Sequence, residues 1–595
     1  MFRRGGTWGE PDKAKNSSKA LRQLIAYIGS YKPLILLVIL MAIAATALGV
    51  MSPRLLGDAT DEIFRGIGVG MDFDAIGRIM IQLIIIVGLS VVFNFLQNYI
   101  MAGVAMKIMH RLRNELSEKV HRLPLHYFDK NPPGDVLSRI ANDTDTLSNT
   151  LNSGLTQFVI SAAAVIGIVV MMLTISPLLT LVTLLTLPVS FGAMFFIVKR
   201  SQKYFSAQAA ILGKLNGHIE EMFSSHSIVK AFNGEEKSVA KFDEHNNELY
   251  KSNWKASFLS GLMWPMTIFI SNLGYVVVII IGGAMALAGN ISIGGIQAFI
   301  QYNRQFGQPI NQLAGVASTL QQTAAAAERV FAFLAEDEEV PENPNPVVAD
   351  NVKGRVTFEK ISFGYDPETP VIHNFNMTAE PGQKIAIVGH TGAGKTTIVK
   401  LLMRFYDVDS GSIKVDGEDI RNYTRNGLRG VFGMVLQDTW LFNGSIADNI
   451  RYGRLNASEE EVRKAAKAAS ADHFIRALPE GYDMMINEEA DNISAGQKQL
   501  LTIARTILAD PQILILDEAT SNVDTRTELM IQKAMDKLME GRTSFVIAHR
   551  LSTIRSADMI LVMENGDIVE QGNHEELLTK GGVYTRLYNS QFDAA

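Results

Sequence analysis

Four long stretches without a charged residue constrain this chain more than any other feature. They cover residues 33–53, 79–106, 146–198 and 256–303. A helix needs ~20 mostly apolar residues to cross the ~30 Å of hydrocarbon in a bilayer, so the first two stretches each fit one span. The third would be ~80 Å long as one helix, and we expect it to turn back at Ser176-Pro177. The fourth is interrupted at Gly289-Asn290, which predicts two further spans.

The distribution of positive charge predicts how these spans are oriented. Lys and Arg concentrate in residues 3–32, 107–139 and 199–255, which the positive-inside rule places in the cytoplasm, with the acidic stretch 58–74 outside. The C-terminal half carries a nucleotide motif, described below, and must be cytoplasmic too, so the number of spans must be even. We therefore predict six spans, the sixth being the rather polar segment 293–320, which faces protein or water. The N-terminal segment lacks an apolar core, so no cleavable signal peptide is expected.

Polar side chains inside the expected spans are candidates for a substrate pathway, because a charged group costs ~2.5–3.5 kcal/mol at the centre of a membrane helix. Arg304 is the best single candidate. The alternative, hydrogen bonding to neighbouring helices or snorkelling toward the interface, explains the same residues equally well. The candidate set is Asn94, Gln97, Asn98, Gln301, Arg304 and Gln308.

Composition excludes several classes of site and partner. The chain has no cysteine, which rules out disulfides, Cys-ligated zinc or iron–sulfur sites and a cysteine nucleophile. Its 55 Lys and Arg against 61 Asp and Glu give a net charge of −6, which argues against nucleic acid as a partner.

The composition changes in the C-terminal half, which predicts a multi-domain chain. We expect a cytoplasmic N-terminal segment (1–32), an α-helical transmembrane domain with long cytoplasmic extensions (33–334), an acidic linker (335–352) and a cytoplasmic α/β nucleotide-binding domain (353–595). Short β-rich runs alternate with helical ones in this last part, which indicates a mainly parallel sheet.

The first motif of this α/β domain is a phosphate-binding loop. A buried strand at 384–388 leads into Gly389, His390, Thr391, Gly392, Ala393, Gly394, Lys395, Thr396 and Thr397. Backbone N–H groups at the start of the following helix would hold phosphate oxygens, Lys395 would add positive charge, and the Thr396 hydroxyl would ligate Mg²⁺. The predicted ligands are therefore ATP and Mg²⁺.

A second motif supplies carboxylates. The continuous apolar run 513–516 is typical of a strand covered on both faces, and it ends in Asp517-Glu518. Asp517 would hold Mg²⁺, and Glu518 would act as general base or orient the attacking water. His549 follows another apolar strand and is placed to sense a γ-phosphate at the carboxyl edge of the sheet.

These motifs, together with residues 492–499 and 521–524, occur in the order and spacing of the ATP-binding cassette (ABC) superfamily. Nearly the whole chain resembles one kind of member, an exporter half-transporter in which six helices are fused to one nucleotide-binding domain. The resemblance implies that Tyr365 stacks on adenine and that Gln437 joins the Mg²⁺ shell beside Glu518 and His549 as a catalytic residue. It adds to the nucleotide-binding set Ser494, Ala495, Gly496, Gln497 and Asp524.

The same resemblance implies a dimer. A helix expected from Gln497 to about Leu508 gives the chain a second anion-binding helix start besides that at Lys395, and in the family the two share a nucleotide only between subunits. Residues 127–135 and 224–234 resemble the coupling helices that press on the nucleotide domains. The family most often has Leu-Ser-Gly-Gly-Gln where this chain has Ala495 in the third position, which resembles heterodimeric exporters and favours a second half-transporter chain as partner over a homodimer.

The function expected from these features is ATP-driven export of small amphipathic or apolar compounds across the cytoplasmic membrane, by alternating access and in a multidrug-like manner. A lipid flippase or envelope-biogenesis translocator fits the same motifs. An ATP-gated membrane protein that does not pump is a third reading, which the presence of Glu518 and His549 disfavours.

Overall fold

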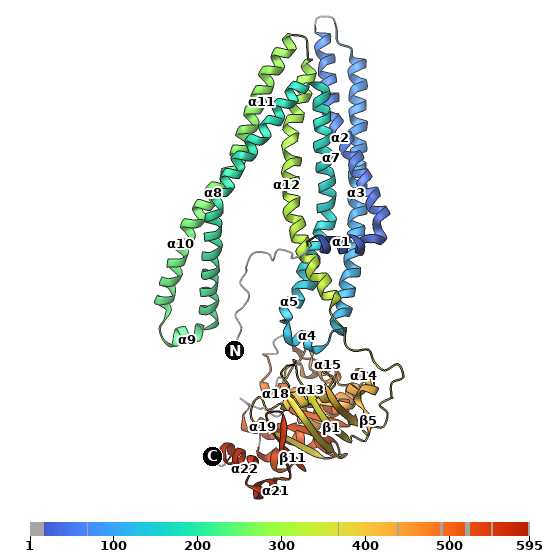
Figure 1. Ribbon diagram of the computed structural model, residues 1–595, viewed down its shortest axis with the longest axis vertical. Helices are drawn as coiled ribbons and strands as arrows, with labels where there is room; N and C mark the ends of the chain where they lie inside the picture. Colours follow the sequence, from blue (N-terminus) through green and yellow to red (C-terminus); the bar gives the residue numbers. More distant parts are fainter. Residues whose placement is uncertain are drawn as a thin grey trace. The chain divides into compact units, whose positions relative to one another are not determined.

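The structure is a computed structural model that describes residues 17–67, 70–366, 368–436, 439–487, 492–517, 524–548 and 551–592. It divides into two compact units (Figure 1). The first comprises the chain up to His121 together with Pro132–Glu336; the second comprises Arg122–Asn131 together with the chain from Asp337 onward. The short segment Arg122–Asn131 therefore packs with the C-terminal part of the chain.

The first unit is entirely helical where it is described. Its helices are α1 (Ser17–Tyr27), α2 (Lys32–Gly66), α3 (Phe73–Arg122), α5 (Pro133–Ser138), α6 (Thr144–Asn149), α7 (Leu155–Ile175), α8 (Pro177–Ser224), α9 (His226–Ala231), α10 (Glu235–Gly261), α11 (Met263–Leu287) and α12 (Ile293–Ala335). A 3₁₀ turn, η1 (Ile28–Tyr31), precedes α2, and two π-helical turns, η2 (Arg139–Asp143) and η3 (Thr150–Gly154), interrupt the helical run from α5 to α7.

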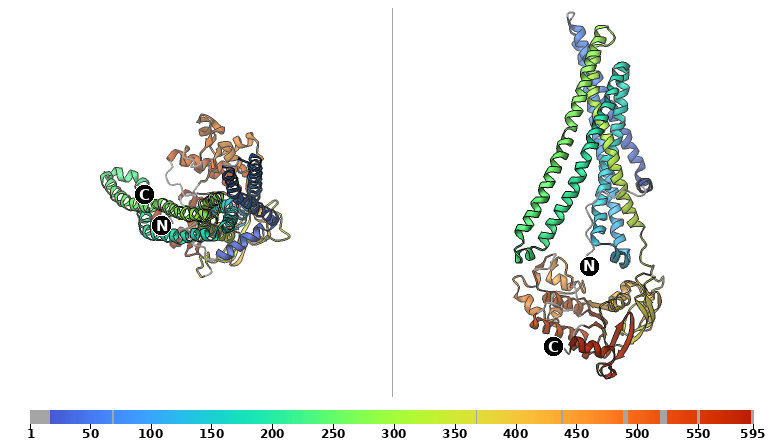
Figure 2. Two further views of the ribbon diagram at one scale, coloured as in Figure 1. Left: turned by 90° about the horizontal axis from the view of Figure 1, so that it is seen from above. Right: turned by 60° about the vertical axis from the view of Figure 1, so that its left-hand side comes forward.

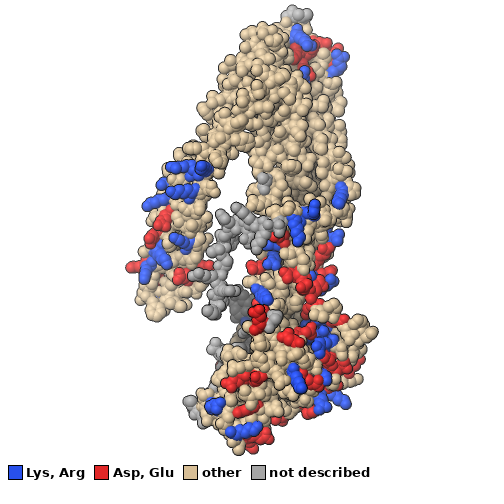
Figure 3. Space-filling model, viewed as in Figure 1, with Lys and Arg blue, Asp and Glu red and all other residues tan. Residues whose placement is uncertain are grey.

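Five helical segments among the described residues are long and apolar enough to cross a membrane: Ser17–Gly66, Phe73–Arg122, Pro133–Ile175, Pro177–Ser224 and Glu235–Leu287. The predicted turn at Ser176-Pro177 is confirmed, because α7 ends at Ile175 and the Ser176 hydroxyl caps α8 by accepting from the Leu179 N–H. On the face drawn in Figure 3, the upper part of this unit is almost free of charged side chains below its tip, as a lipid-facing surface requires.

The helix α12, expected to be the sixth span, is too polar to count among these five apolar segments, and the sixth span stays a prediction. Some of its polar side chains are paired with neighbouring helices. Gln312 Oε1 accepts from Gln157 Nε2 at 2.7 Å and from Ser161 Oγ at 2.9 Å, and the Thr323 hydroxyl lies 2.7 Å from that of Thr150. Hydrogen bonding between helices thus accounts for Gln312 and Thr323, while Gln305 and Gln308 are exposed.

The outer end of α12 lies against α2 with almost no space between the backbones. The Gly294 N–H donates to Asp61 Oδ1 at 2.7 Å, and the Thr60 hydroxyl donates to Gln297 Oε1 at 2.5 Å. A Cβ on Gly294 would lie 1.9 Å from the carbonyl oxygen of Gly57. Glycine at this position is what allows the two helices to approach so closely.

At its other end α12 is held by an ion pair. Arg329 donates to both carboxylate oxygens of Asp143, from Nε at 2.9 Å and from Nη2 at 2.5 Å, and the Asp143 side chain is only 7% exposed. Such a bidentate pair fixes geometry as well as neutralising a buried carboxylate. Asp143 is the last residue of the π-helical turn η2, so the wider turn and the ion pair occur together.

The second unit contains two main sheets. The antiparallel sheet has the order β2-β1-β4-β5, and the larger sheet has the order β12-β11-β3-β10-β9-β6, with a small hairpin β7-β8. The strands are β1 (Val356–Phe363), β2 (Ile372–Ala379), β3 (Lys384–Val388), β4 (Ser410–Val415), β5 (Glu418–Asp419), β6 (Phe432–Val435), β7 (Gly444–Ser445), β8 (Met485–Ile486), β9 (Ile513–Asp517), β10 (Thr543–Ile547), β11 (Met559–Glu564) and β12 (Asp567–Gly572). All pairings in the larger sheet are parallel except β11 with β12, so the predicted α/β domain with a mainly parallel sheet is confirmed.

Both faces of this sheet are covered, one of them partly by the antiparallel sheet, where Phe358 meets Phe545, which is why its strands read as continuous apolar runs. Along β9, Leu514 and Leu516 pack into one buried cluster while Ile513 and Ile515 pack into another. The helices of the unit are α4 (Leu125–Lys130), α13 (Lys395–Leu402), α14 (Arg425–Val431), α15 (Ile446–Arg451), α16 (Glu459–Ala468), α17 (Asp472–Ala477), α18 (Ala495–Ala509), α19 (Thr525–Met539), α20 (Leu551–Arg555), α21 (His574–Lys580) and α22 (Val583–Phe592), with 3₁₀ turns η4 (Ile420–Asn422) and η5 (Gly481–Asp483).

The acidic linker expected at 335–352 is tied to this unit by its charges. Glu339 forms ion pairs with Arg425 at 3.3 Å and with Arg429 at 3.5 Å, and Glu342 accepts from the backbone N–H of Arg425 at 2.7 Å. The predicted domain boundaries themselves stay predictions, since compact packing alone divides the chain at Glu336.

The close approach of α2 and α12 gives a first testable prediction. In Gly294→Ala, the added methyl group would collide with the Gly57 carbonyl and with Asp61 Cγ, 2.7 Å away, so the helices must separate. We expect a loss of ~1–3 kcal/mol, measured as a lower unfolding temperature of the detergent-solubilised protein. Gly315→Ala on the same helix is the matched control, because nothing lies within 4 Å of its added Cβ. Equal unfolding temperatures for the two variants would contradict the proposed close contact.

Candidate functional site

The phosphate-binding loop emerges at the carboxyl edge of the larger sheet. The strand β3 ends at Val388, the loop follows, and α13 begins at Lys395. Gly392 and Gly394 have φ of +86° and +97°, a backbone conformation that side chains with a Cβ rarely adopt. A Cβ on Gly389 would lie 2.3 Å from the carbonyl oxygen of Met563. The glycines of the motif are therefore needed both for the turn and for its packing.

Lys395 folds back over this loop. Its Nζ donates to the carbonyl oxygens of Gly389 at 2.7 Å and His390 at 3.0 Å. Burial lowers the pKa of the Lys395 ammonium below its ordinary value, and the nearby carboxylate of Asp517 opposes that shift. An ammonium at the start of a helix, beside the backbone N–H groups of its first turn, is suited to receive the oxygens of a triphosphate.

Parallel pairing places Asp517 at the same edge as the loop. The strand β10 lies between β3 and β9, and Ile547 is in register with Ile387 on one side and Asp517 on the other. A cavity of about 400 Å³ is lined by Lys395, Thr396 and Asp517. The remaining lining residues are Val371, Thr391, Gly392, Gly394, Thr397 and Ile547.

Tyr365, expected to stack on adenine, is connected to the phosphate loop. It is half-buried, and its hydroxyl lies 3.2 Å from the hydroxyl of Thr397 on α13. Its ring meets those of Phe363 and Tyr406 edge to face, at centroid distances of 5.2 Å and 5.1 Å. No pattern in the sequence pointed to Tyr406, because its contact with Tyr365 exists only in the folded unit.

The second anion-binding helix start is α18, which begins two residues earlier than the sequence suggested. It runs from Ala495, with Ser494 as its N-cap, because Ser494 and Gln497 cap each other: the Gln497 N–H donates to Ser494 Oγ at 3.3 Å and the Ser494 N–H to Gln497 Oε1 at 2.9 Å. Ser494 and Ala495 are exposed and Gly496 is buried. Among the described residues that line the phosphate-loop cavity, none belongs to α18.

The remaining predicted nucleotide residues divide into two groups. Asp524 is the N-cap of α19, and hydrogen bonds from the Thr527 and Arg526 backbone N–H groups lower its pKa. Gln437, Glu518 and His549 lie outside the described residues.

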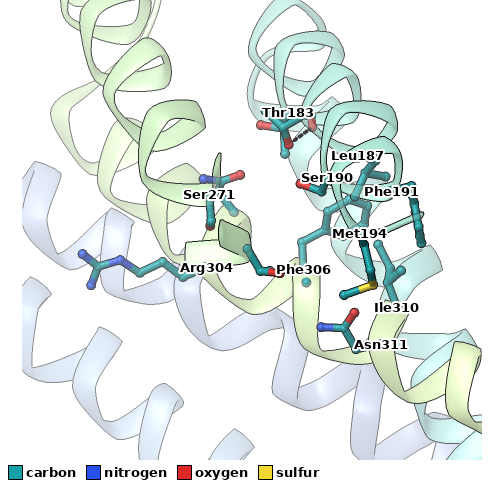
Figure 4. A pocket seen from close by; sticks show the side chains of 14 residues that line it. Thr183, Leu187, Ser190, Phe191, Met194, Ser271, Arg304, Phe306, Ile310 and Asn311 are labelled. Carbon is teal, nitrogen blue, oxygen red and sulfur yellow. Dashed lines mark hydrogen bonds between the residues drawn. The ribbon is translucent and has the colours of Figure 1, made fainter. Parts of the chain in front are cut away.

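In the first unit, a cavity of about 100 Å³ lies among α8, α11 and α12 (Figure 4). Apolar residues, among them Phe191, Met194 and Phe306, alternate in its wall with the polar side chains of Ser190 and Asn311. The other lining residues are Thr183, Thr186, Leu187, Thr267, Ser271, Asn303, Arg304, Gly307 and Ile310.

Only Arg304 of the six predicted pathway residues lines this cavity. Its guanidinium lies over the Tyr275 ring, 5.3 Å from the centroid, and points away from the other labelled side chains in Figure 4. Gln97 is fully buried and donates to Asn94 Oδ1 at 3.2 Å. The other positions, Asn98, Gln301 and Gln308, are exposed or half-buried elsewhere on α3 and α12.

Comparison with known proteins matches both units to families. Residues 35–310 match the family described as ABC transporter transmembrane region, and residues 372–521 match the family described as ABC transporter. The first match covers most of the helical unit, and the second contains the phosphate-binding loop, α18 and Asp517.

Relatives match over nearly the full length. A protein of Mycobacterium bovis named fatty acid ABC transporter ATP-binding/permease protein is 46% identical, over 95% of this chain and 95% of its own length. An uncharacterized ABC transporter ATP-binding protein of Bacillus subtilis, YfiC, is 43% identical over 98% of this chain and 96% of its own. A solved structure, a bacterial Atm1-family ABC exporter with ATP bound, is 30% identical with a TM-score of 0.68, covering 94% of this chain and 98% of that one.

These matches cover both the helical unit and the nucleotide unit, and the two units follow each other in the same order. The helical unit spans a membrane, and the nucleotide-binding unit is cytoplasmic. The chain therefore belongs to the ABC transporters, as an exporter half-transporter whose ATPase domain is fused to its membrane domain.

Proposed function

We propose that this half-transporter exports amphipathic or apolar compounds, acyl compounds among them, from the cytoplasm or the inner leaflet. The observation that carries the proposal is the mixed lining of the cavity among α8, α11 and α12, where aromatic and thioether side chains stand beside hydroxyl and amide groups. Such a wall suits ligands with an apolar body and a polar end. The name of the Mycobacterium bovis relative, which refers to fatty acids, supports the acyl class.

A lipid flippase is the second candidate, because a fatty acid and a membrane lipid share the acyl chain. Either function uses alternating access driven by ATP. If ATP bound the inward-open and closed states with equal affinity, it would not change the populations of the two states. Moving the ratio of closed to inward-open protein from 1:99 to 99:1 needs a roughly 10⁴-fold difference in affinity.

In the nucleotide site we assign roles from position and chemistry. Tyr365 stacks on adenine, the loop from Gly389 to Thr397 holds the phosphates, and Lys395 turns from its carbonyl contacts toward the β- and γ-phosphates. Glu518, which follows Asp517 in the sequence, orients and deprotonates the attacking water, with His549 and Gln437 at the γ-phosphate.

The donor set at this site fits Mg²⁺. The hydroxyl of Thr396 and the carboxylate of Asp517 line one cavity, and Mg²⁺ prefers such oxygen ligands, usually only one or two from the protein. When bound, the ion neutralises charge on the phosphates. Thr396 and Asp517 would hold it.

We further propose that the nucleotide is shared between two subunits. Ser494 Oγ already accepts from Gln497, so its hydroxyl hydrogen remains available to donate to a phosphate of another chain. The partner is a different half-transporter rather than a second copy, because the Ala495 methyl group stands at the exposed start of α18.

Replacing the proposed base tests turnover. Glu518→Gln keeps the shape of the side chain but removes its basicity, so we expect steady-state ATP hydrolysis to fall by at least about 100-fold while ATP binding is retained. Glu540→Gln, an exposed carboxylate at the end of α19, is the matched control. Unchanged hydrolysis in Glu518→Gln would show that Glu518 is not the catalytic base. Ion conductance that persists in this variant without hydrolysis would favour an ATP-gated protein over a pump.

Transport is tested in vesicles that expose the nucleotide domains to the medium. With ATP and Mg²⁺, the vesicles are expected to accumulate a fluorescent fatty acid or an amphipathic dye, and vesicles with Glu518→Gln are not. Movement of a headgroup-labelled lipid without accumulation of either soluble probe would support the flippase, and no movement of any probe would contradict both functions.

The composition of the dimer is tested with Ala495→Gly in the chain expressed alone. If the methyl group obstructs the shared phosphate site, the chain alone hydrolyses ATP slowly and the substitution raises its turnover several-fold. Ala509→Gly, at the exposed opposite end of α18, controls for the loss of helix propensity. A fully active homodimer that Ala495→Gly does not change would argue for two identical chains.

A further inference from the structure

A short helix far from the nucleotide motifs in sequence meets the nucleotide unit at a cluster of charged and aromatic side chains. The helix α4 packs within the second unit. Its Asp129 accepts hydrogen bonds from the ammonium of Lys400 at 3.0 Å and from the hydroxyl of Tyr406. The neighbouring His126 ring meets the Tyr406 ring edge to face, with the centroids 6.2 Å apart.

The same two partners of Asp129 also contact Tyr365. Lys400 Nζ lies over the rings of both tyrosines, 5.5 Å from the centroid of Tyr365 and 5.7 Å from that of Tyr406. The two rings themselves are perpendicular at 5.1 Å. One side chain of α4 is therefore connected to the Tyr365 ring by two routes, a cation and an aromatic ring.

The charges of this cluster are balanced around Asp129. Burial alone would raise the pKa of this carboxyl, but the hydrogen bonds from Tyr406 and Lys400 outweigh burial and hold it below its ordinary value. For the Tyr406 hydroxyl, burial and the bond to Asp129 act together and raise its pKa. Asp129 thus accepts as a carboxylate, and the Tyr406 phenol donates to it.

Lys400 also links the cluster to the phosphate loop. It lies on α13, the helix that begins at Lys395, and Tyr365 reaches the same helix through its hydroxyl contact with Thr397 at 3.2 Å. The orientation of the Tyr365 ring is therefore fixed from two sides, by α13 and by the side chains that Asp129 holds.

We propose that Asp129 is a positioning residue for nucleotide binding, which acts on the Tyr365 ring through Lys400 and Tyr406. The inference rests on the proposed stacking of adenine on Tyr365. With Asp129 in place, the cation and the Tyr406 ring are held and the platform is preorganised, so less ordering is needed when the nucleotide binds. Because coupling between two sites is reciprocal, nucleotide bound at Tyr365 strengthens the docking of α4 by the same factor.

The test is steady-state ATP hydrolysis by the full-length protein in its assembled, membrane-reconstituted form. Asp129→Asn weakens the bonds to Lys400 and Tyr406, and we expect the KM for ATP to rise about threefold to tenfold with kcat nearly unchanged. Tyr406→Phe, which removes only the hydroxyl and keeps the ring, is expected to change KM in the same direction by less. Asp536→Asn, an exposed carboxylate on α19 with no ion pair to another described residue, is the matched control.

A double variant separates this inference from the function on which it rests. If Asp129 acts through Tyr365, then Asp129→Asn adds nothing to the KM of Tyr365→Ala. An unchanged KM in Tyr365→Ala would overturn the proposed adenine stacking. A raised KM in Tyr365→Ala together with an unchanged KM in Asp129→Asn, or with fully additive effects in the double variant, would overturn the positioning role and leave the stacking intact. A fall in kcat alone in Asp129→Asn would also overturn it.

Discussion

The absence of water from the bilayer interior is the constraint on which this structure depends. Each backbone N–H and C=O in the hydrocarbon must find a partner within the protein, and a helix satisfies them within one segment. The uncharged stretches of the chain therefore become long helices, and polar side chains are tolerated where a neighbouring helix supplies a partner. The same kind of pairing occurs along α12, whose place as a sixth span stays a prediction: Gln297, Gln312 and Thr323 each bond to another helical segment, and the charge of Arg329 is neutralised by Asp143.

A different rule governs the nucleotide unit. Its central strands are covered on both faces, so they are apolar throughout, and their parallel arrangement brings all their carboxyl ends to one edge. Residues 129 positions apart, Val388 and Asp517, end strands that share β10 as neighbour. The residues that line this cavity need not be close in sequence, because the sheet brings the ends of their strands together. The start of α18 is outside the described lining of that cavity, as the proposed sharing of the nucleotide between two subunits requires.

The helix α4 follows a membrane helix in the sequence but belongs to the nucleotide unit. The segment Arg122–Asn131 leaves one long helix of the membrane unit at α3, yet it packs with the nucleotide unit. Its contact is small and partly exposed, with 41% of the Asp129 and 27% of the Lys400 side chain accessible, so single bonds in it are weak. In the proposed role this contact holds aromatic and cationic side chains in place, and we expect its effect in nucleotide affinity rather than in stability.

The sequence alone determined the helical membrane unit, the turn at Ser176-Pro177, the parallel-sheet unit and the phosphate-binding loop. These features depend on local patterns: hydrophobic length, capping, and glycines at positions of positive φ. Only the tertiary structure decided that Gly294 touches Gly57, that Arg304 lies over the Tyr275 ring, and that Asp129 meets Lys400 and Tyr406. Those contacts join residues up to 277 positions apart, and no local pattern encodes them because they exist only once the elements have packed.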